Sequence, residues 1–145
     1  MTEARSRRMR SITVIRWLKA LSAVVVAAAI IGIWFEATAQ RDDLARRASA
    51  MTGGNVEHGR TLAKARGCAG CHEIPGIDGA NGHVGPPLTS FARRVYVGGV
   101  LLNTPDYLRQ WLLDPPSIDP KTAMPNVGLN DQEARDVAAF LYTLD

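Results

Sequence analysis

The chain begins with a long apolar run that is unlike anything after it. No charged residue occurs between Ala20 and Phe35, and the eight residues from Ile12 to Lys19 are mostly apolar. An α-helix rises about 1.5 Å per residue, so roughly 20 residues cross the hydrocarbon core of a bilayer. Residues 12–35 are therefore predicted to form one transmembrane helix, because the basic side chains of Arg16 and Lys19 can reach the headgroups.

After residue 54 the pattern changes to short amphipathic helices between stretches rich in glycine and proline. Asn55, Thr104 and Asn130 each stand where a polar side chain can cap the start of a helix. Pro105 follows Thr104 at the first helical position, and Glu133 resembles the partner of Asn130 in a capping box. These signals predict an all-α domain with helices at residues 55–66, 104–114 and 130–144.

Two further segments complete the predicted organisation. Residues 1–11 form a basic arm, and residues 36–54 form a spacer in which a short polar helix can precede a flexible joint at Gly53 and Gly54. The folded domain is predicted at residues 55–145. A domain of roughly 90 residues has only a small hydrophobic core. Long loops without secondary structure add little to the packing of that core. We therefore expect a bound group in the middle of the domain.

Charge is distributed unevenly along the chain. Residues 1–35 contain six basic residues and one acidic residue, a net charge of +5, whereas the other 11 basic and 13 acidic residues give −2. The basic balance of the whole chain is therefore no argument for binding nucleic acid. Basic residues before a membrane helix keep that end in the cytoplasm, so the domain is predicted on the outer, periplasmic face of the cytoplasmic membrane. The alternative is a cleaved signal peptide, since Ala37–Ala39 is typical of a cleavage site.

The residues that indicate the chemistry are Cys68, Cys71 and His72, which form a C-x-x-C-H motif. This motif is typical of c-type haem attachment, because one helical turn presents both thiols to one edge of a porphyrin and the histidine to its iron. Three alternatives compete with it. A thioredoxin-like site requires neighbouring strands, a zinc site requires a second pair of ligands, and a disulfide across two residues would be strained. Haem attachment is the prediction that the sequence favours.

A six-coordinate haem requires a second axial ligand, and Met124 is the best candidate in the sequence. It lies in a loop between Pro120 and Pro125, where two prolines stiffen the backbone around a weak thioether ligand. The competing interpretation is that Met124 only fills a gap in the core. His58 and His83 are predicted to be solvated.

Together these motifs resemble a class I cytochrome c, in the small bacterial, membrane-anchored group that includes domains fused to or serving haem–copper oxidases. The resemblance covers residues 55–144. It implies an all-α cytochrome c fold, after the transmembrane helix, in which Gly59 and Phe140 lie at a close helix crossing. It also implies that Cys68 and Cys71 bind one haem c covalently and that His72 and Met124 bind its iron. Further haem-binding residues are implied at Pro86, which accepts a hydrogen bond from the histidine, at Arg93, which neutralises a haem propionate, and at Trp111, Leu112 and Thr122 on the distal side.

The function follows from the two axial ligands. If both are in place, no position on the iron is open to a substrate, so the protein is expected to be a one-electron carrier and not an enzyme, with no small-molecule substrate. The family implies a quinol-oxidising complex as electron donor and a terminal oxidase as acceptor in a respiratory chain. A fixed haem subunit of an oxidase or dehydrogenase is the main alternative, and a haem peroxidase or gas sensor is a further one.

Overall fold

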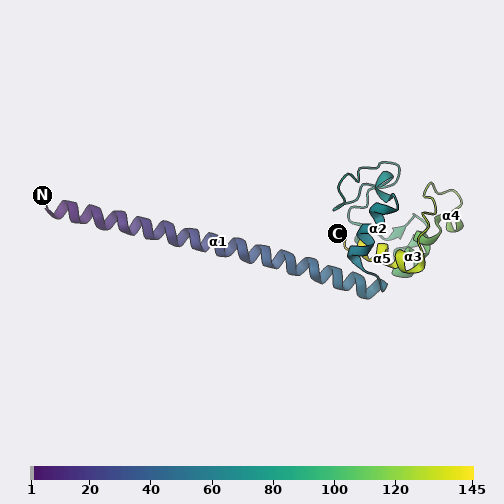
Figure 1. Cartoon of the computed structure of the whole chain (residues 1–145), viewed down its shortest axis with the longest axis horizontal. Helices are drawn as coiled ribbons and strands as arrows, with labels where there is room; N and C mark the ends of the chain where they lie inside the picture. Colours follow the sequence, from purple (N-terminus) through teal and green to yellow (C-terminus); the bar gives the residue numbers. More distant parts are fainter. Residues whose placement is uncertain (1) are drawn as a thin grey trace. The chain divides into compact units, whose positions relative to one another are not determined.

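The structure is a computed structural model that describes the backbone of residues 2–145 and the side chains from Trp17 onward. The side chains of the basic arm at residues 1–11, and those of the predicted anchor before Trp17, lie outside the described residues. The chain is mostly helical, which confirms the predicted all-α class (Figure 1). The elements in chain order are α1 (Thr2–Thr52), α2 (Val56–Ala65), η1 (Cys68–Gly70), η2 (Phe91–Arg93), β1 (Tyr96–Val97), β2 (Leu101–Leu102), α3 (Pro105–Leu113), α4 (Pro115–Ile118) and α5 (Asp131–Leu141).

Helix α1 contains the apolar run found in the sequence. The chain divides into two compact units, Met1–Gln40 and Arg41–Asp145. In the first unit, large apolar side chains such as Ile33 and Trp34 are exposed on the helix. The described part of α1, from Trp17 onward, is long and apolar enough to cross a membrane. The prediction of a single apolar N-terminal helix that could span a bilayer is therefore confirmed.

The spacer predicted at residues 36–54 is helical as far as Thr52, so its helix is longer than the short polar helix that the sequence allows. Helix α1 continues without interruption to Thr52, whose hydroxyl donates a hydrogen bond of 2.9 Å to the carbonyl of Ala48. Ala48 and Thr52 are buried in the second unit, and this packing stabilises the last turns of the helix. Gly53 ends the helix with a left-handed φ of 69°, and its carbonyl accepts a hydrogen bond from Gln132. The joint is thus fixed to α5.

Helices α2, α3 and α5 each begin at the capping residue that the sequence predicts. The Asn55 side chain accepts a hydrogen bond of 2.9 Å from the backbone N–H of His58 and starts α2. Thr104 accepts one from the N–H of Tyr107 at the start of α3. Asn130 and Glu133 form the reciprocal capping box at the start of α5. The prolines after α3 start the extra short helix α4, since proline is favoured in a first helical turn.

Helices α2 and α5 cross closely, and Gly59 makes this possible. A Cβ atom at Gly59 would overlap the carbonyl oxygen of Asp136, so the bare glycine admits the backbone of α5. The expected aromatic partner, Phe140, is completely buried in α5, and the Arg60 guanidinium lies 5.1 Å from the centre of its ring. The crossing itself is as expected, but the space at Gly59 accommodates a main chain and not an aromatic ring.

Candidate functional site

The C-x-x-C-H segment forms a single tight turn directly after α2. Gly67 adopts a left-handed φ of 77° and starts η1, and the carbonyl of Cys68 accepts hydrogen bonds from the N–H groups of Cys71 and His72. Both cysteines are free thiols on this turn. Burial raises the pKa of the Cys68 thiol, which therefore stays protonated at neutral pH. A Cβ atom at Gly82 would lie 2.7 Å from the Cα of Cys71, so the following loop packs directly on the turn.

His72 is held by one ring nitrogen, which leaves the other free. Its Nδ1 lies 2.8 Å from the carbonyl oxygen of Pro86. A carbonyl can only accept, so Nδ1 carries the proton and Nε2 keeps its lone pair for a metal. Gly85 lies against the imidazole, where a Cβ would come within 2.7 Å of Nδ1. Its N–H donates a hydrogen bond of 2.8 Å to the carbonyl of Cys71, which connects the Pro86 loop to the C-x-x-C-H turn.

Met124 lies in the loop between α4 and α5, and three contacts fix that loop. The side chain of Asp119 accepts a hydrogen bond of 3.0 Å from the backbone N–H of Lys121. Next, the Thr122 hydroxyl oxygen accepts one of 3.2 Å from the N–H of Met124. On the other side, the indole Nε1 of Trp111 donates to the Met124 sulfur at 3.1 Å. The Met124 thioether therefore has a defined position, which these contacts set.

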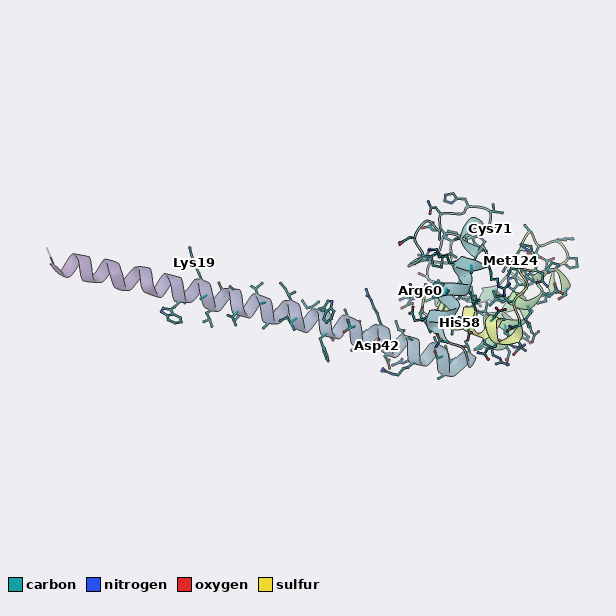
Figure 2. The ribbon with its side chains drawn as sticks, viewed as in Figure 1. Lys19, Asp42, His58, Arg60, Cys71 and Met124 are labelled. Carbon is teal, nitrogen blue, oxygen red and sulfur yellow. The ribbon has the colours of Figure 1, made fainter. Side chains whose placement is uncertain are left out.

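A largely apolar cavity of about 500 Å³ lies between the C-x-x-C-H turn at Cys68–His72 and the loop that contains Met124. Cofactor pockets are usually of this size, about 300–1,000 Å³, and mostly apolar. Cys71 and Met124, labelled in Figure 2, both line it. So do most of the residues predicted from the sequence to bind the group: Cys68, His72, Pro86, Trp111, Leu112 and Thr122. The structure thus brings eight of the nine predicted site residues together.

Arg93 is the exception. It is exposed, and its guanidinium forms a two-pronged ion pair with Asp145, in which Nη2 donates to Oδ2 at 2.9 Å. This hydrogen bond holds the pKa of the Asp145 carboxyl below its usual range. The neighbouring Arg94 lines the cavity instead. Since η2 is a tight 3-10 turn, consecutive residues leave it in different directions, and the sequence signal of two adjacent arginines did not identify which one faces inward.

The remaining alternatives for the cysteines find no support in this geometry. Among the residues whose side chains are described, no three His, Cys, Asp or Glu side chains are placed to hold a metal ion. The strand pair β1–β2 joins Tyr96 to Leu102 and Val97 to Leu101 and is far too small for a thioredoxin-like sheet. Two free thiols on one turn, a free imidazole nitrogen, a fixed thioether and an apolar cavity between them fit a covalent haem.

Comparison with known proteins decides the family. A family model for cytochrome c matches residues 56–145. The chain belongs to the cytochrome c family. A cytochrome c domain implies a covalently attached haem c and electron transfer through it.

One relative extends this comparison. The cytochrome c oxidase subunit 2 of Alkalihalophilus pseudofirmus is 30% identical to this cytochrome over 90 residues, which make up 61% of the chain and 25% of that protein. The present chain therefore spans about a quarter of the length of this relative. The similarity supports the resemblance to c-type cytochromes that are associated with oxidases.

Proposed function

We propose that this cytochrome is a one-electron carrier whose haem iron is bound by His72 and Met124. One observation supports this most strongly: His72 and Met124 line the same cavity, and each is held there by a hydrogen bond, the histidine to Pro86 and the methionine to Trp111. Haem c supplies an iron that changes its charge by one unit. Two fixed protein ligands leave no coordination position for oxygen, peroxide or another substrate.

The residues of the chain then control how easily the charge changes. The Pro86 carbonyl accepts from His72 Nδ1 and makes the imidazole a stronger electron donor. A thioether ligand, by contrast, raises the reduction potential relative to a second nitrogen. Apolar side chains such as Leu108 and Leu112 are buried around the cavity and exclude water from the group. The proposed ligand set therefore favours a carrier with a fairly high potential.

We further propose that α1 is a retained single-pass anchor in the cytoplasmic membrane, with the N-terminus inside and the haem domain outside. Helix α1 continues through Ala37–Ala39 without a break, which supports a retained helix over a cleavage site. Anchoring raises the effective concentration of the cytochrome near membrane partners. A quinol-oxidising complex is the proposed donor, and a terminal oxidase is the proposed acceptor.

Spectroscopy of the purified full chain tests the ligand set. We expect a covalently bound low-spin haem and, in the oxidised protein, a weak sulfur-to-iron charge-transfer band. Met124→Ala should abolish this band, whereas the matched control Met51→Ala, at an exposed position of α1, should retain it. Rapid binding of carbon monoxide to the unmodified reduced protein would contradict the proposal, because it requires an open or labile position.

A fixed subunit of an oxidase complex is the second candidate. It is favoured by the relative, in which a similar domain is part of an oxidase subunit 2. Mild detergent extraction followed by size separation distinguishes the two candidates. A mobile carrier should migrate alone, whereas a fixed subunit should migrate with a larger complex.

A further inference from the structure

Arg94 is the cationic side chain in the wall of the proposed haem cavity. Its guanidinium donates to the carbonyl oxygens of Pro87 and Thr89, the latter at 3.3 Å. It also lies 5.5 Å from the centre of the Phe91 ring, within the range of a cation–π contact. These contacts fix the guanidinium from one side, and they leave donors for a further acceptor because the group has five N–H bonds.

Asn103 fixes the backbone that carries this arginine. Its Nδ2 donates hydrogen bonds of 3.1 Å to two carbonyl oxygens, those of Phe91 and Arg94. The N–H of Asn103 donates a third, of 2.9 Å, to the carbonyl of Val95. Both amide protons of the side chain are thus used, and they hold the first residue of η2 and the carbonyl of the arginine itself. A side chain without two donors could not make this connection.

Tyr142 sets the orientation of the Asn103 amide. The phenol hydroxyl at the end of α5 donates a hydrogen bond of 3.0 Å to Asn103 Oδ1, so Nδ2 must face the two carbonyls. Burial raises the pKa of Tyr142 to about 12, and the hydroxyl therefore remains a donor across the neutral range. The Tyr142 ring also packs edge-on against Phe91, with 6.1 Å between the ring centres.

We propose that Asn103 and Tyr142 are positioning residues that fix the Arg94 guanidinium for a carboxylate of the haem. The proposal rests on the proposed function, since it requires a haem in the cavity. It names Arg94, and not the exposed Arg93, as the partner of that carboxylate. It also assigns the hairpin end at Asn103 and the last helix at Tyr142 a part in setting the reduction potential, although neither residue lines the cavity.

The physical effect of the network is electrostatic. A guanidinium held next to a carboxylate cancels its negative charge in a region of low dielectric, where charges act most strongly. If the arginine is removed or moves away, the uncompensated carboxylate stabilises the more positive, oxidised iron. The reduction potential should therefore fall. Arg93 is exposed and already paired with Asp145, so its charge is screened by water and should contribute little.

The experiment is a double-mutant cycle on the haem-loaded full chain, with the reduction potential as readout. Arg94→Gln should lower the potential, and Arg93→Gln, the matched control, should leave it unchanged. Asn103→Ala should lower it in the same direction and by a smaller shift. In the Arg94→Gln background, Asn103→Ala should have no further effect, because its action passes through the arginine.

Several outcomes would overturn the proposal. An equal shift from Asn103→Ala in both backgrounds would mean that Asn103 acts independently of Arg94. An unchanged potential together with a lower free energy of unfolding would reduce Asn103 to a structural role. If Asn103→Ala fails to fold, Tyr142→Phe decides, since it removes one hydroxyl and should still lower the potential only when Arg94 is present. If the unmodified chain carries no covalently bound haem, the proposed function itself is refuted.

Discussion

The indole Nε1 of Trp111 lies 3.1 Å from the sulfur of Met124, so the proposed methionine ligand accepts a hydrogen bond from a buried ring. The hydrogen bond draws electron density from the sulfur. The thioether is therefore a weaker donor to the oxidised iron, and the reduced form is favoured.

Trp111→Phe should lower the reduction potential, because the ring remains but its N–H donor is lost. A hydrogen bond has a net value of about 0.5–1.5 kcal/mol. Because only the difference in this value between the oxidised and the reduced protein changes the potential, the shift should be at most roughly 20–60 mV for one electron. A redox titration measures this shift. An unchanged potential, with the sulfur-to-iron band retained, would show that the indole packs against the methionine without affecting its bond to iron.

Two adjacent glycines in the hairpin test how tightly the indole is held. Gly98 and Gly99 both have a left-handed φ, of 60° and 77°. A Cβ atom at Gly98 would come within 2.7 Å of the Trp111 ring, whereas one at Gly99 would meet nothing within 4 Å. Gly99→Ala should cost only the backbone strain of about 1–2 kcal/mol, and Gly98→Ala should cost more and also shift the methionine-dependent absorption band. Chemical unfolding and absorption spectra of both variants measure the difference, and equal losses with unchanged spectra would contradict it.

Local signals in the sequence were sufficient for the helix caps and for the C-x-x-C-H turn. The capping box of Asn130 and Glu133 depends only on residues three apart, and the turn from Cys68 to His72 is contained within five residues. Such features need no knowledge of the tertiary structure. The all-α class and four of the cavity residues, Cys68, Cys71, His72 and Met124, could therefore be predicted from the residues themselves, whereas Pro86, Trp111, Leu112 and Thr122 came only from the resemblance to cytochrome c.

The uninterrupted length of α1 could not be predicted, because it depends on contacts with distant segments of the domain. Residues 36–54 have a composition that suits either a helix or a coil, and burial of Ala48 and Thr52 decides for the helix. The resemblance implied Arg93 at a haem propionate, and its exposure follows from the left-handed φ of 52° at Ser90 and the tight turn after it, a local conformation that no residue pattern predicts. Neither has a periodic signal in the sequence.

The close crossing of α2 and α5 gives a direct stability prediction. Gly59→Ala should lower the free energy of unfolding by more than about 2 kcal/mol, because its Cβ has only the α5 backbone to displace. Thr61→Ala, at an exposed position of the same helix, should have a much smaller effect. Denaturant titration of both variants provides the measurement. A loss at Gly59 no larger than that at Thr61 would mean that the helices separate at little cost.

Asp136 is a buried carboxylate of α5 that joins the start of α2 to the domain. Burial opposes its ionisation, but it accepts hydrogen bonds from the Asn55 N–H at 2.7 Å and from Gln132 at 3.0 Å, and His58 Nδ1 lies 2.6 Å away. Together these hydrogen bonds outweigh burial and hold its pKa below the ordinary value of 3.8.

A carboxyl whose pKa is lower in the folded than in the unfolded chain stabilises the fold above the unfolded pKa, and this stabilisation disappears as the pH falls through the folded pKa. Asp136→Asn should therefore lower the free energy of unfolding at pH 7, by about 1–3 kcal/mol for a buried hydrogen-bonded charge. The difference from the unmodified chain should begin to shrink below about pH 4, where the unfolded aspartate takes up a proton, and should continue to shrink as the pH falls through the lower folded pKa. Denaturant titrations at pH 7, 5 and 3 measure both curves. A constant difference across that range would mean that shape and packing, and not the charge of Asp136, hold the start of α2 in place.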